Sequence, residues 1–478
     1  MDISNSLSQS RTISNQETGS EEFESVTKND YGLELDSEIQ ETSTISDVTL
    51  VKPIRSAEVI ESPTKFEKPR DRLNIVFFIF FFFGCSSLVA WNMFITVSFD
   101  YYEAFKLQTS DGKSNWYSQN FQNAMTICAQ LPSAIFCILS IFKDLRGNLP
   151  FRMQCSLLIS GTVLLITMTL IYVETESWIP IFFVFTLFTV VVLNAAIGVF
   201  QNAMFGLVST FPFKYTNAVI IGQNFNGILI TLLSISSKLV SNNSQISAMI
   251  FFGIAVLMIL ACILLLMLVQ KNEFYRRFGV LDKINSQRSI QENDQNFWQK
   301  IGHVFKKAGW QFFNIFWLFF VTLSIYPNIT VYIRPKDPES FFISEKFYLD
   351  VVTFLNFNFF AFLGNLAANY VKFPGPKYII IPVLLRFWFI FYFPFCNYNP
   401  EFRRFDVFFE STWLFIANLA FMSWTSGYLS SLIMMYAPRT CSDPQLQRLA
   451  GMISLVFLLL GIMSGLCFSW IIKLIVLN

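Results

Sequence analysis

The chain has 478 residues, of which 53% are hydrophobic and only 14% are charged, with a formal net charge of +1. A typical soluble domain carries roughly 25% charged residues, so this chain has too few charges to cover a water-facing surface. The mean hydropathy of +0.48 agrees. This composition excludes a soluble enzyme, a collagen and a wholly disordered protein, and it indicates a membrane protein.

Residues 1–70 differ from the rest of the chain. They hold 14 Asp or Glu and 7 Lys or Arg, with many Ser and Thr and no long apolar run. Such a segment buries too little apolar surface to offset the entropy of ordering it. We expect a disordered, acidic, cytoplasmic tail. It is a candidate for phosphorylation, and the alternative is a solubilising tail without a sequence-specific role.

Cysteine and histidine usage predicts no metal site and no cofactor. The eight cysteines lie mostly in apolar runs without a CxxC pair, and His303 is the single histidine. A disulfide framework or a zinc site would need paired spacings that are missing here.

From residue 74 onward, apolar runs of about 20 residues recur, the length that a helix needs to cross a membrane. We predict eleven transmembrane helices, at approximately 74–98, 119–142, 154–173, 178–208, 217–239, 246–270, 311–333, 348–371, 378–397, 412–436 and 449–475. The predicted fold class is therefore an all-α polytopic membrane protein.

Loop cations predict the orientation, because cytoplasmic loops are enriched in Lys and Arg. With the N-terminus inside, the loops at 143–152, 271–307, 372–377 and 439–448 are cytoplasmic and basic. The C-terminus is then extracytoplasmic. The predicted domains are an N-terminal six-helix bundle (74–270), a cytoplasmic linker (271–310) and a C-terminal five-helix bundle (311–478). A 6+5 division is typical of the major-facilitator-like architecture, in which two bundles rock about a central site.

The end of the linker has an amphipathic pattern. Apolar residues repeat at three- and four-residue spacing from Phe297 to Ala308, while Lys300, Lys306 and Lys307 lie off that stripe. The pattern predicts a basic amphipathic helix at the inner membrane surface. A docking site for a cytosolic partner is the alternative.

Polar side chains inside the spans are candidate site residues, because each needs a partner or water. They are Trp91 with Asn92, Gln201, the segment Gly222-Gln223-Asn224-Phe225-Asn226-Gly227, Asn356, Asn358, Asn365 and Arg386. Amides beside aromatic rings suit a neutral, planar, hydrogen-bonding ligand. No catalytic constellation is present, so we predict that the protein is not an enzyme.

Each candidate also has a purely structural interpretation. Intramembrane Asn and Gln often only join neighbouring helices, at about 0.6 kcal/mol each. Trp91 fits an interfacial aromatic belt, and Gly222 and Gly227 fit close helix contacts. Arg386 fits a brace that binds backbone carbonyls, an interpretation that we favour over direct ligand contact.

The same residues resemble the equilibrative nucleoside transporter family, over roughly residues 74–475. The similar segments are Ala90-Trp91-Asn92-Met93-Phe94-Ile95-Thr96, Asn123 to Pro132, Gln201 to Leu207, Gly222-Gln223 with Gly227, Thr322 to Pro327, and Ser426 to Leu429. Their order and spacing carry the resemblance more than any one of them.

This resemblance implies nucleoside transport down a gradient by alternating access. It assigns substrate contacts to Trp91, Met125, Gln201, Phe354 and Asn358. Gln201 would hydrogen-bond the base, while Trp91 and Met125 would line the pocket. Structural or gating roles are expected for a second set, namely Asn92, Gly222, Gln223, Gly227 and Arg386.

The chain departs from the family pattern in the eighth predicted span. The family has Asp and Arg where this chain has Ala361 and Asn365. Losing both charges together leaves no unpaired buried ion. We therefore expect weaker ribose recognition or a shift toward nucleobases, with Asn365 still able to bind a hydroxyl.

The expected partners are a nucleoside or nucleobase substrate and the lipid bilayer, and no nucleic acid. We favour the plasma membrane over an endolysosomal membrane, and facilitated diffusion over proton symport. The alternatives are a carrier for another small planar or cationic solute, and a non-transporting membrane receptor or scaffold.

Overall fold

The computed structural model describes residues 71–108, 115–144, 148–240, 244–277, 297–337, 339, 341–400 and 403–477. The predicted tail and residues 278–296 of the predicted linker lie outside the described residues. The described chain is helical, and its β-structure consists of isolated bridges such as Ile333 with Tyr398. This is the expected outcome for long apolar runs, because a helix satisfies its own backbone hydrogen bonds without water.

The first helical group comprises residues 75–269. Its helices are α1 (Ile75–Val97), α2 (Trp116–Asp144), α3 (Leu149–Thr169), α4 (Ile179–Val208), α5 (Phe213–Val240) and α6 (Ser244–Val269). The π-helix η2 (Ser98–Lys106) continues α1.

The second helical group comprises residues 297–476. Its long helices are α8 (Phe297–Ile325), α10 (Asn356–Tyr370), α13 (Thr412–Arg439) and α14 (Pro444–Val476). The shorter elements are α9 (Glu345–Tyr348), the π-helix η6 (Leu349–Leu355), α11 (Ile380–Leu385), α12 (Trp388–Tyr392) and the 3₁₀ turn η7 (Phe393–Phe395).

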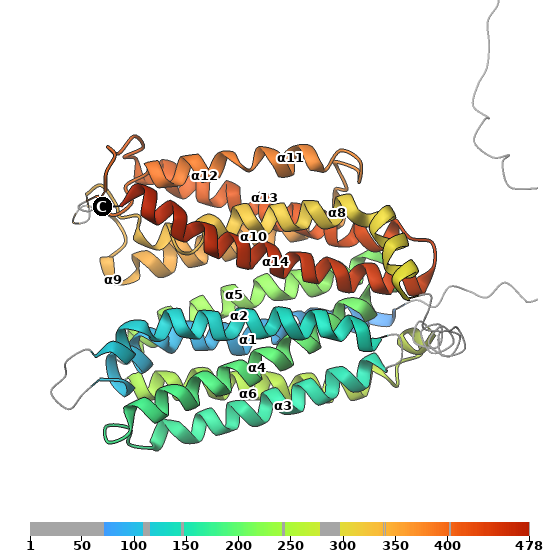
Figure 1. The fold of residues 1–478 in the computed structure, drawn as a ribbon, viewed down its shortest axis with the longest axis horizontal. Coiled ribbons are helices and arrows are strands. Elements are labelled where there is room, and N and C mark those ends of the chain that lie inside the picture. Colours follow the sequence, from blue (N-terminus) through green and yellow to red (C-terminus); the bar gives the residue numbers. More distant parts are fainter. Residues whose placement is uncertain are drawn as a thin grey trace, which may run out of the picture. The chain divides into compact units, whose positions relative to one another are not determined.

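The two groups lie side by side with their helices roughly aligned, and α5 lies where they meet (Figure 1). We call the end at which α6 finishes at Val269 and α8 begins at Phe297 the linker end. The opposite end, at which α14 finishes at Val476, is the far end.

Glycines set the closest helix contacts in both groups. A β-carbon at Gly222 of α5 would collide with the carbonyl oxygen of Phe81 in α1. A β-carbon at Gly427 of α13 would collide with the carbonyl oxygen of Ala361 in α10. In lipid, where apolar surface has no drive to leave water, such close backbone approach is a main source of helix association.

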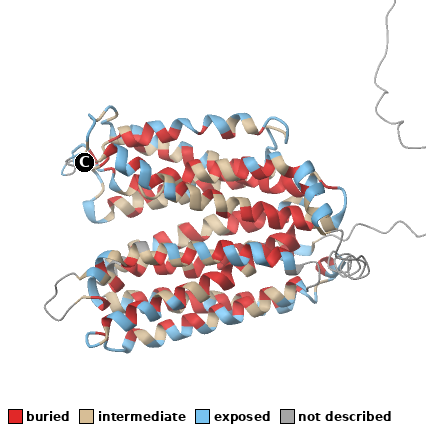
Figure 2. Ribbon diagram, viewed as in Figure 1, coloured by how far each residue is buried: buried red, intermediate tan, exposed pale blue. Residues whose placement is uncertain are grey.

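The exposed surface of the helices is apolar. Exposed positions recur along the helices (Figure 2). Among them, Ile181, Val184 and Leu257 are each about two-thirds exposed. Within the described residues, nine helical stretches are long and apolar enough to cross a membrane, and Ile380–Phe395 is a shorter apolar one. Because exposed side chains of this kind suit lipid and not water, the protein is an integral, multi-pass membrane protein.

Two elements differ from the sequence prediction in their continuity. The amphipathic segment before residue 311 is not a separate helix, because α8 runs unbroken from Phe297 to Ile325. In contrast, the single span predicted at 378–397 is divided between α11 and α12. At this division the backbone hydrogen bonds join residues three apart, as in a 3₁₀ helix. The Phe387 amide donates to the Leu384 carbonyl, and the Phe389 amide donates to the Arg386 carbonyl.

Candidate functional site

Two predicted glutamines from different helices meet at one residue of α1. The side-chain amide of Gln201 in α4 donates to the Ser87 carbonyl oxygen at 3.2 Å. The amide of Gln223 in α5 donates to the Ser87 hydroxyl, also at 3.2 Å. Ser87 in turn donates to the Gly84 carbonyl. Ser87 is not among the predicted site residues, although the pair Ser86-Ser87 inside an apolar run is a detectable signal.

On the other side of α5, Gly227 faces Asn358 of α10. A β-carbon at Gly227 would occupy the position of the Asn358 side-chain oxygen. The Asn358 amide nitrogen donates to the Phe354 carbonyl one turn earlier, at 2.9 Å. Asn358 therefore lies against α5 because position 227 has no side chain.

An aromatic cluster lies beside Asn358. The rings of Tyr326 and Phe357 stack with centroids 3.7 Å apart and planes 7° from parallel. The ring of Phe354 lies edge-on to Tyr326 at 6.2 Å. Phe357 is the chain neighbour of Asn358, and the Phe354 carbonyl accepts the Asn358 side-chain hydrogen bond. Rings beside an amide form the combination that binds a planar, polar ligand.

Helix α5 joins these two sets of residues. Gln223 and Gly227 are four residues apart, about 6 Å along the helix axis. One reaches toward Ser87 in the first helical group, and the other contacts Asn358 in the second. Gln223, Phe354 and Asn358 keep part of their surface accessible although they lie inside helices. Amide and aromatic groups from both helical groups therefore approach each other in the middle of the structure.

The remaining predicted residues of α1 and α2 lie in the packed interior. Trp91 is one turn beyond Ser87 and is partly buried against the main apolar cluster, to which the fully buried Met125 of α2 belongs. Asn92 is partly buried, and its backbone carbonyl accepts a hydrogen bond from Thr96 at 2.8 Å.

Asn365 is fully buried between α5, α10 and α13. Its side-chain oxygen accepts from Ser431 at 3.0 Å, and its amide donates to the Ile220 carbonyl at 3.5 Å. Its backbone carbonyl accepts from Asn217 at 2.8 Å. Asn365 lies seven residues beyond Asn358, about 10 Å closer to the linker end. Its hydrogen-bonding groups are already used between helices.

Ala361, the second position that departs from the family pattern, faces a different helix. It is 2% exposed, and its backbone packs against Gly427 of α13. A carboxylate here would be buried between α10 and α13, at high cost unless a cation joined it.

Arg386 lies at the division between α11 and α12 and is 3% exposed. Its guanidinium donates to the Met422 carbonyl at 2.8 Å and to the Thr322 hydroxyl at 2.8 Å, and it also bonds Thr425. The arginine thereby ties this division to α8 and α13. All of these contacts are within the second helical group.

One ion pair that the sequence analysis missed joins the two helical groups at the far end. The Lys238 ammonium of α5 lies 2.6 Å from the Asp350 carboxylate of η6, and Ser234 also donates to Asp350 at 3.3 Å. Asp350 is 5% exposed. An acid close to the start of an apolar run was the available signal, but the sequence could not indicate its partner 112 residues away.

Comparison with known proteins agrees with this architecture. A family model described as nucleoside transporter matches residues 187–474, more than half of the chain. The chain is 28% identical to equilibrative nucleoside transporter 1 of Homo sapiens, over 86% of this chain and all of that protein. It is 26% identical to equilibrative nucleoside transporter 3 of Rattus norvegicus, over 84% of this chain and 89% of that protein.

The fold is similar to a solved major facilitator superfamily structure, the proton:xylose symporter XylE bound to 6-bromo-6-deoxy-D-glucose. The TM-score is 0.52 at 10% identity, covering 84% of this chain and 87% of that one. At this identity the likeness concerns the fold alone. The matched family model extends from α4 into α14 and includes the Gln201, Asn358 and Arg386 positions, and on this evidence the chain belongs to the nucleoside transporter family.

Proposed function

We propose that this protein is a facilitative transporter of nucleosides, with nucleobases as candidate further substrates, and that it works by alternating access. Membership of the nucleoside transporter family supports this proposal. The observation that carries it is that Gln201 and Gln223 converge on Ser87 in one helical group, while Gly227, one turn along α5 from Gln223, contacts Asn358 of the other. A substrate held between two groups of helices is released when they rock apart.

In the proposed architecture, eleven spans divide 6+5. The predicted span at 348–371 corresponds to α9, η6 and α10 together, and the span at 378–397 corresponds to α11 through η7. The linker end is cytoplasmic and the far end extracytoplasmic, in agreement with the cations at Lys271, Lys372 and Arg439. The proposed location is the plasma membrane.

In the proposed site, side chains of both helical groups hold one nucleoside. The Gln201 side chain, which is anchored on Ser87, would pair with the base edge beside the partly buried Trp91. Met125, which is fully buried in the apolar cluster, would support that side of the site from the packed interior. Phe354 of η6 and Asn358 of α10 would contact the substrate from the other helical group. Ala361 offers no polar group and Asn365 is engaged by Ser431, so fewer contacts remain for the ribose.

Uptake of labelled uridine into proteoliposomes containing the purified full chain tests the proposal. We expect flux that stops at equal concentrations on both sides, and competition by adenosine and inosine. If the ribose is weakly recognised, uracil, adenine and hypoxanthine compete nearly as well as the matching nucleosides. A receptor or scaffold would give no flux, and a cation carrier would give flux of organic cations without uridine competition.

A matched pair of variants tests the site. Asn358→Ala removes an amide that faces α5, whereas Asn356→Ala removes one that donates to the Ile416 carbonyl of α13. We expect Asn358→Ala to raise KM for uridine about tenfold, the loss of a good hydrogen bond. Asn356→Ala should leave KM nearly unchanged. Equal effects of the two variants would contradict the assignment of Asn358.

A further inference from the structure

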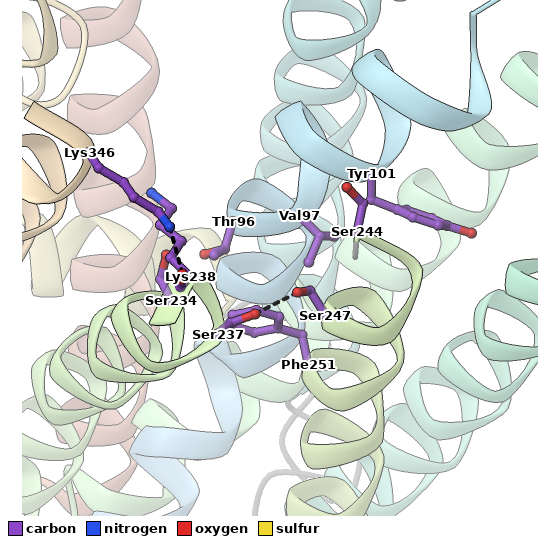
Figure 3. A pocket seen from close by; sticks show the side chains of 10 residues that line it. All are labelled: Thr96, Val97, Tyr101, Ser234, Ser237, Lys238, Ser244, Ser247, Phe251 and Lys346. Atoms are coloured by element: carbon purple, nitrogen blue, oxygen red, sulfur yellow. Dashed lines mark hydrogen bonds between the residues drawn. The ribbon is translucent and has the colours of Figure 1, made fainter. Parts of the chain in front are cut away.

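A cavity of about 310 Å³ lies at the far end of the structure, outside the candidate site (Figure 3). Residues of α1, η2, α5, α6 and α9 line it, namely Thr96, Val97, Tyr101, Ser234, Ser237, Lys238, Ser244, Ser247, Phe251 and Lys346. The volume is at the lower limit for small-molecule sites.

The lining of this cavity is polar and basic. It contains two ammonium groups and several hydroxyls, and none of the ten lining residues carries a carboxylate. Ser237 and Ser247 share one hydrogen bond at 2.5 Å, which leaves one of their two hydroxyl protons for a ligand. Such a lining presents donors to whatever enters.

The two lysines provide more donors than their protein partners use. An ammonium group carries three N–H donors and no acceptor. Lys238 directs one to Asp350 at 2.6 Å, and Lys346 directs one to the Lys238 carbonyl oxygen at 2.8 Å. The carbonyl is neutral, so two lysines and one aspartate leave the cavity with a net positive charge.

We propose that this cavity is a binding site for a phosphate group, either inorganic phosphate or the 5′-phosphate of a nucleoside monophosphate. Phosphate offers several charged acceptor oxygens in a compact group, which suits lysine ammoniums together with hydroxyls. A cation is disfavoured by the same charges. The volume accommodates an ester larger than phosphate alone.

If the protein transports nucleosides as proposed, a phosphate bound in this cavity should affect transport. Lys238 belongs to α5 in the first helical group, while Lys346 belongs to α9 in the second. A phosphate bound to both would hold the two groups together at the far end. A nucleoside monophosphate is therefore expected to bind there and to inhibit nucleoside uptake from that side.

Binding of labelled uridine monophosphate and of labelled inorganic phosphate to the purified full chain in detergent tests the site directly. Lys346→Gln removes a charge at an exposed position, so folding is retained. We expect it to weaken binding of both probes about tenfold, the contribution of one charge-assisted hydrogen bond. Lys346→Arg should restore binding. Lys473→Gln, an exposed lysine of α14 that does not line the cavity, is the matched control and should bind as wild type.

The outcomes separate this inference from the proposed function. Saturable binding of both probes that depends on Lys346 supports the site, even if uridine flux is absent. Uridine flux without binding of either probe overturns the site and leaves the proposed function intact. If uridine displaces labelled uridine monophosphate as well as unlabelled uridine monophosphate does, the phosphate site is also overturned. The protein would then recognise the nucleoside and not the phosphate.

Discussion

Gly227 and Gly427 both lie in close helix contacts, but a neighbouring side chain fills the space at Gly227 and a neighbouring backbone fills it at Gly427. At Gly227 the space is taken by the end of the Asn358 side chain, which can rotate. At Gly427 it is taken by the backbone of Ala361, which can move only if α10 and α13 separate.

We therefore predict opposite consequences for two alanine substitutions. Gly227→Ala should fold normally and raise KM for uridine several-fold, because Asn358 is displaced. Gly427→Ala should lower the amount of folded protein, since overpacking of this kind costs about 1–3 kcal/mol. Size-exclusion recovery and uptake kinetics of both variants check this. A folding defect at Gly227→Ala with normal KM would contradict the assignment.

The partners of Arg386 each have another hydrogen bond. The Thr322 hydroxyl donates to Leu318 at 2.7 Å, and the Thr425 hydroxyl donates to Phe421 at 2.9 Å. Removing the guanidinium therefore leaves these hydroxyls bonded. An apolar replacement also removes a charge that is nearly inaccessible to water.

We predict that Arg386→Met is within about 1 kcal/mol of wild type in stability. Arg386→Lys should be less stable, by about 1–3 kcal/mol, because one ammonium keeps the buried charge but cannot reach both Thr322 and Met422. Thermal unfolding of the purified variants in detergent measures their relative stability. If Arg386→Met is stable but inactive in uptake, the arginine acts in transport and not as a brace.

At the scale of elements, α5 is fastened to the 349–370 segment at both of its ends. Near the linker end, Asn217 donates to the Asn365 carbonyl and to the Asn369 side chain, each at 2.8 Å. Near the far end, Lys238 pairs with Asp350. Alternating access requires that these fastenings open in turn.

A substitution at either end should therefore loosen the structure at that end and leave the opposite end unchanged. Asn217→Ala should raise hydrogen–deuterium exchange in residues 365–370, and Asp350→Asn should raise it in residues 345–355. Each increase should be roughly threefold, the effect of about 0.6 kcal/mol per interhelical bond. Exchange that rises equally at both ends in either variant would indicate general loosening of the fold and not a shift between two states.

At the scale of the whole molecule, the energetics of transport depend on titratable groups in the pathway. Asp350 is the buried acid between the two helical groups among the described residues, and it is paired with Lys238. The Lys238 ammonium at 2.6 Å and the Ser234 hydroxyl at 3.3 Å already engage this carboxylate within the protein.

We predict a uniporter. Uridine uptake should reach the external concentration and no more, and a protonophore should leave the initial rate unchanged. Proteoliposomes with and without an imposed pH gradient provide the measurement, with protein-free liposomes as the control. Accumulation that collapses with the protonophore would contradict the prediction and make Asp350→Asn the first variant to test.

Local sequence information determines some helices of this protein and not others. The predicted span 178–208 and the helix α4 (Ile179–Val208) nearly coincide, because a long apolar run bounded by Pro180 and Pro212 needs no distant contact to form a helix. The division at Arg386 was not predicted. Its side chain bonds Thr322 and Met422, which lie in other helices, so no local pattern marks it.

The membrane class, the order of the apolar helices and the polar residues worth testing can all be predicted from the amino-acid sequence. Hydropathy and charge act over one or two helical turns, so these properties can be read along the chain. Which polar groups meet depends on the tertiary structure. It directed Gln201 and Gln223 to Ser87, engaged Asn365 with Ser431, and paired Lys238 with Asp350. Such pairings depend on how distant helices pack, and that packing is set by contacts such as those at Gly222 and Gly427.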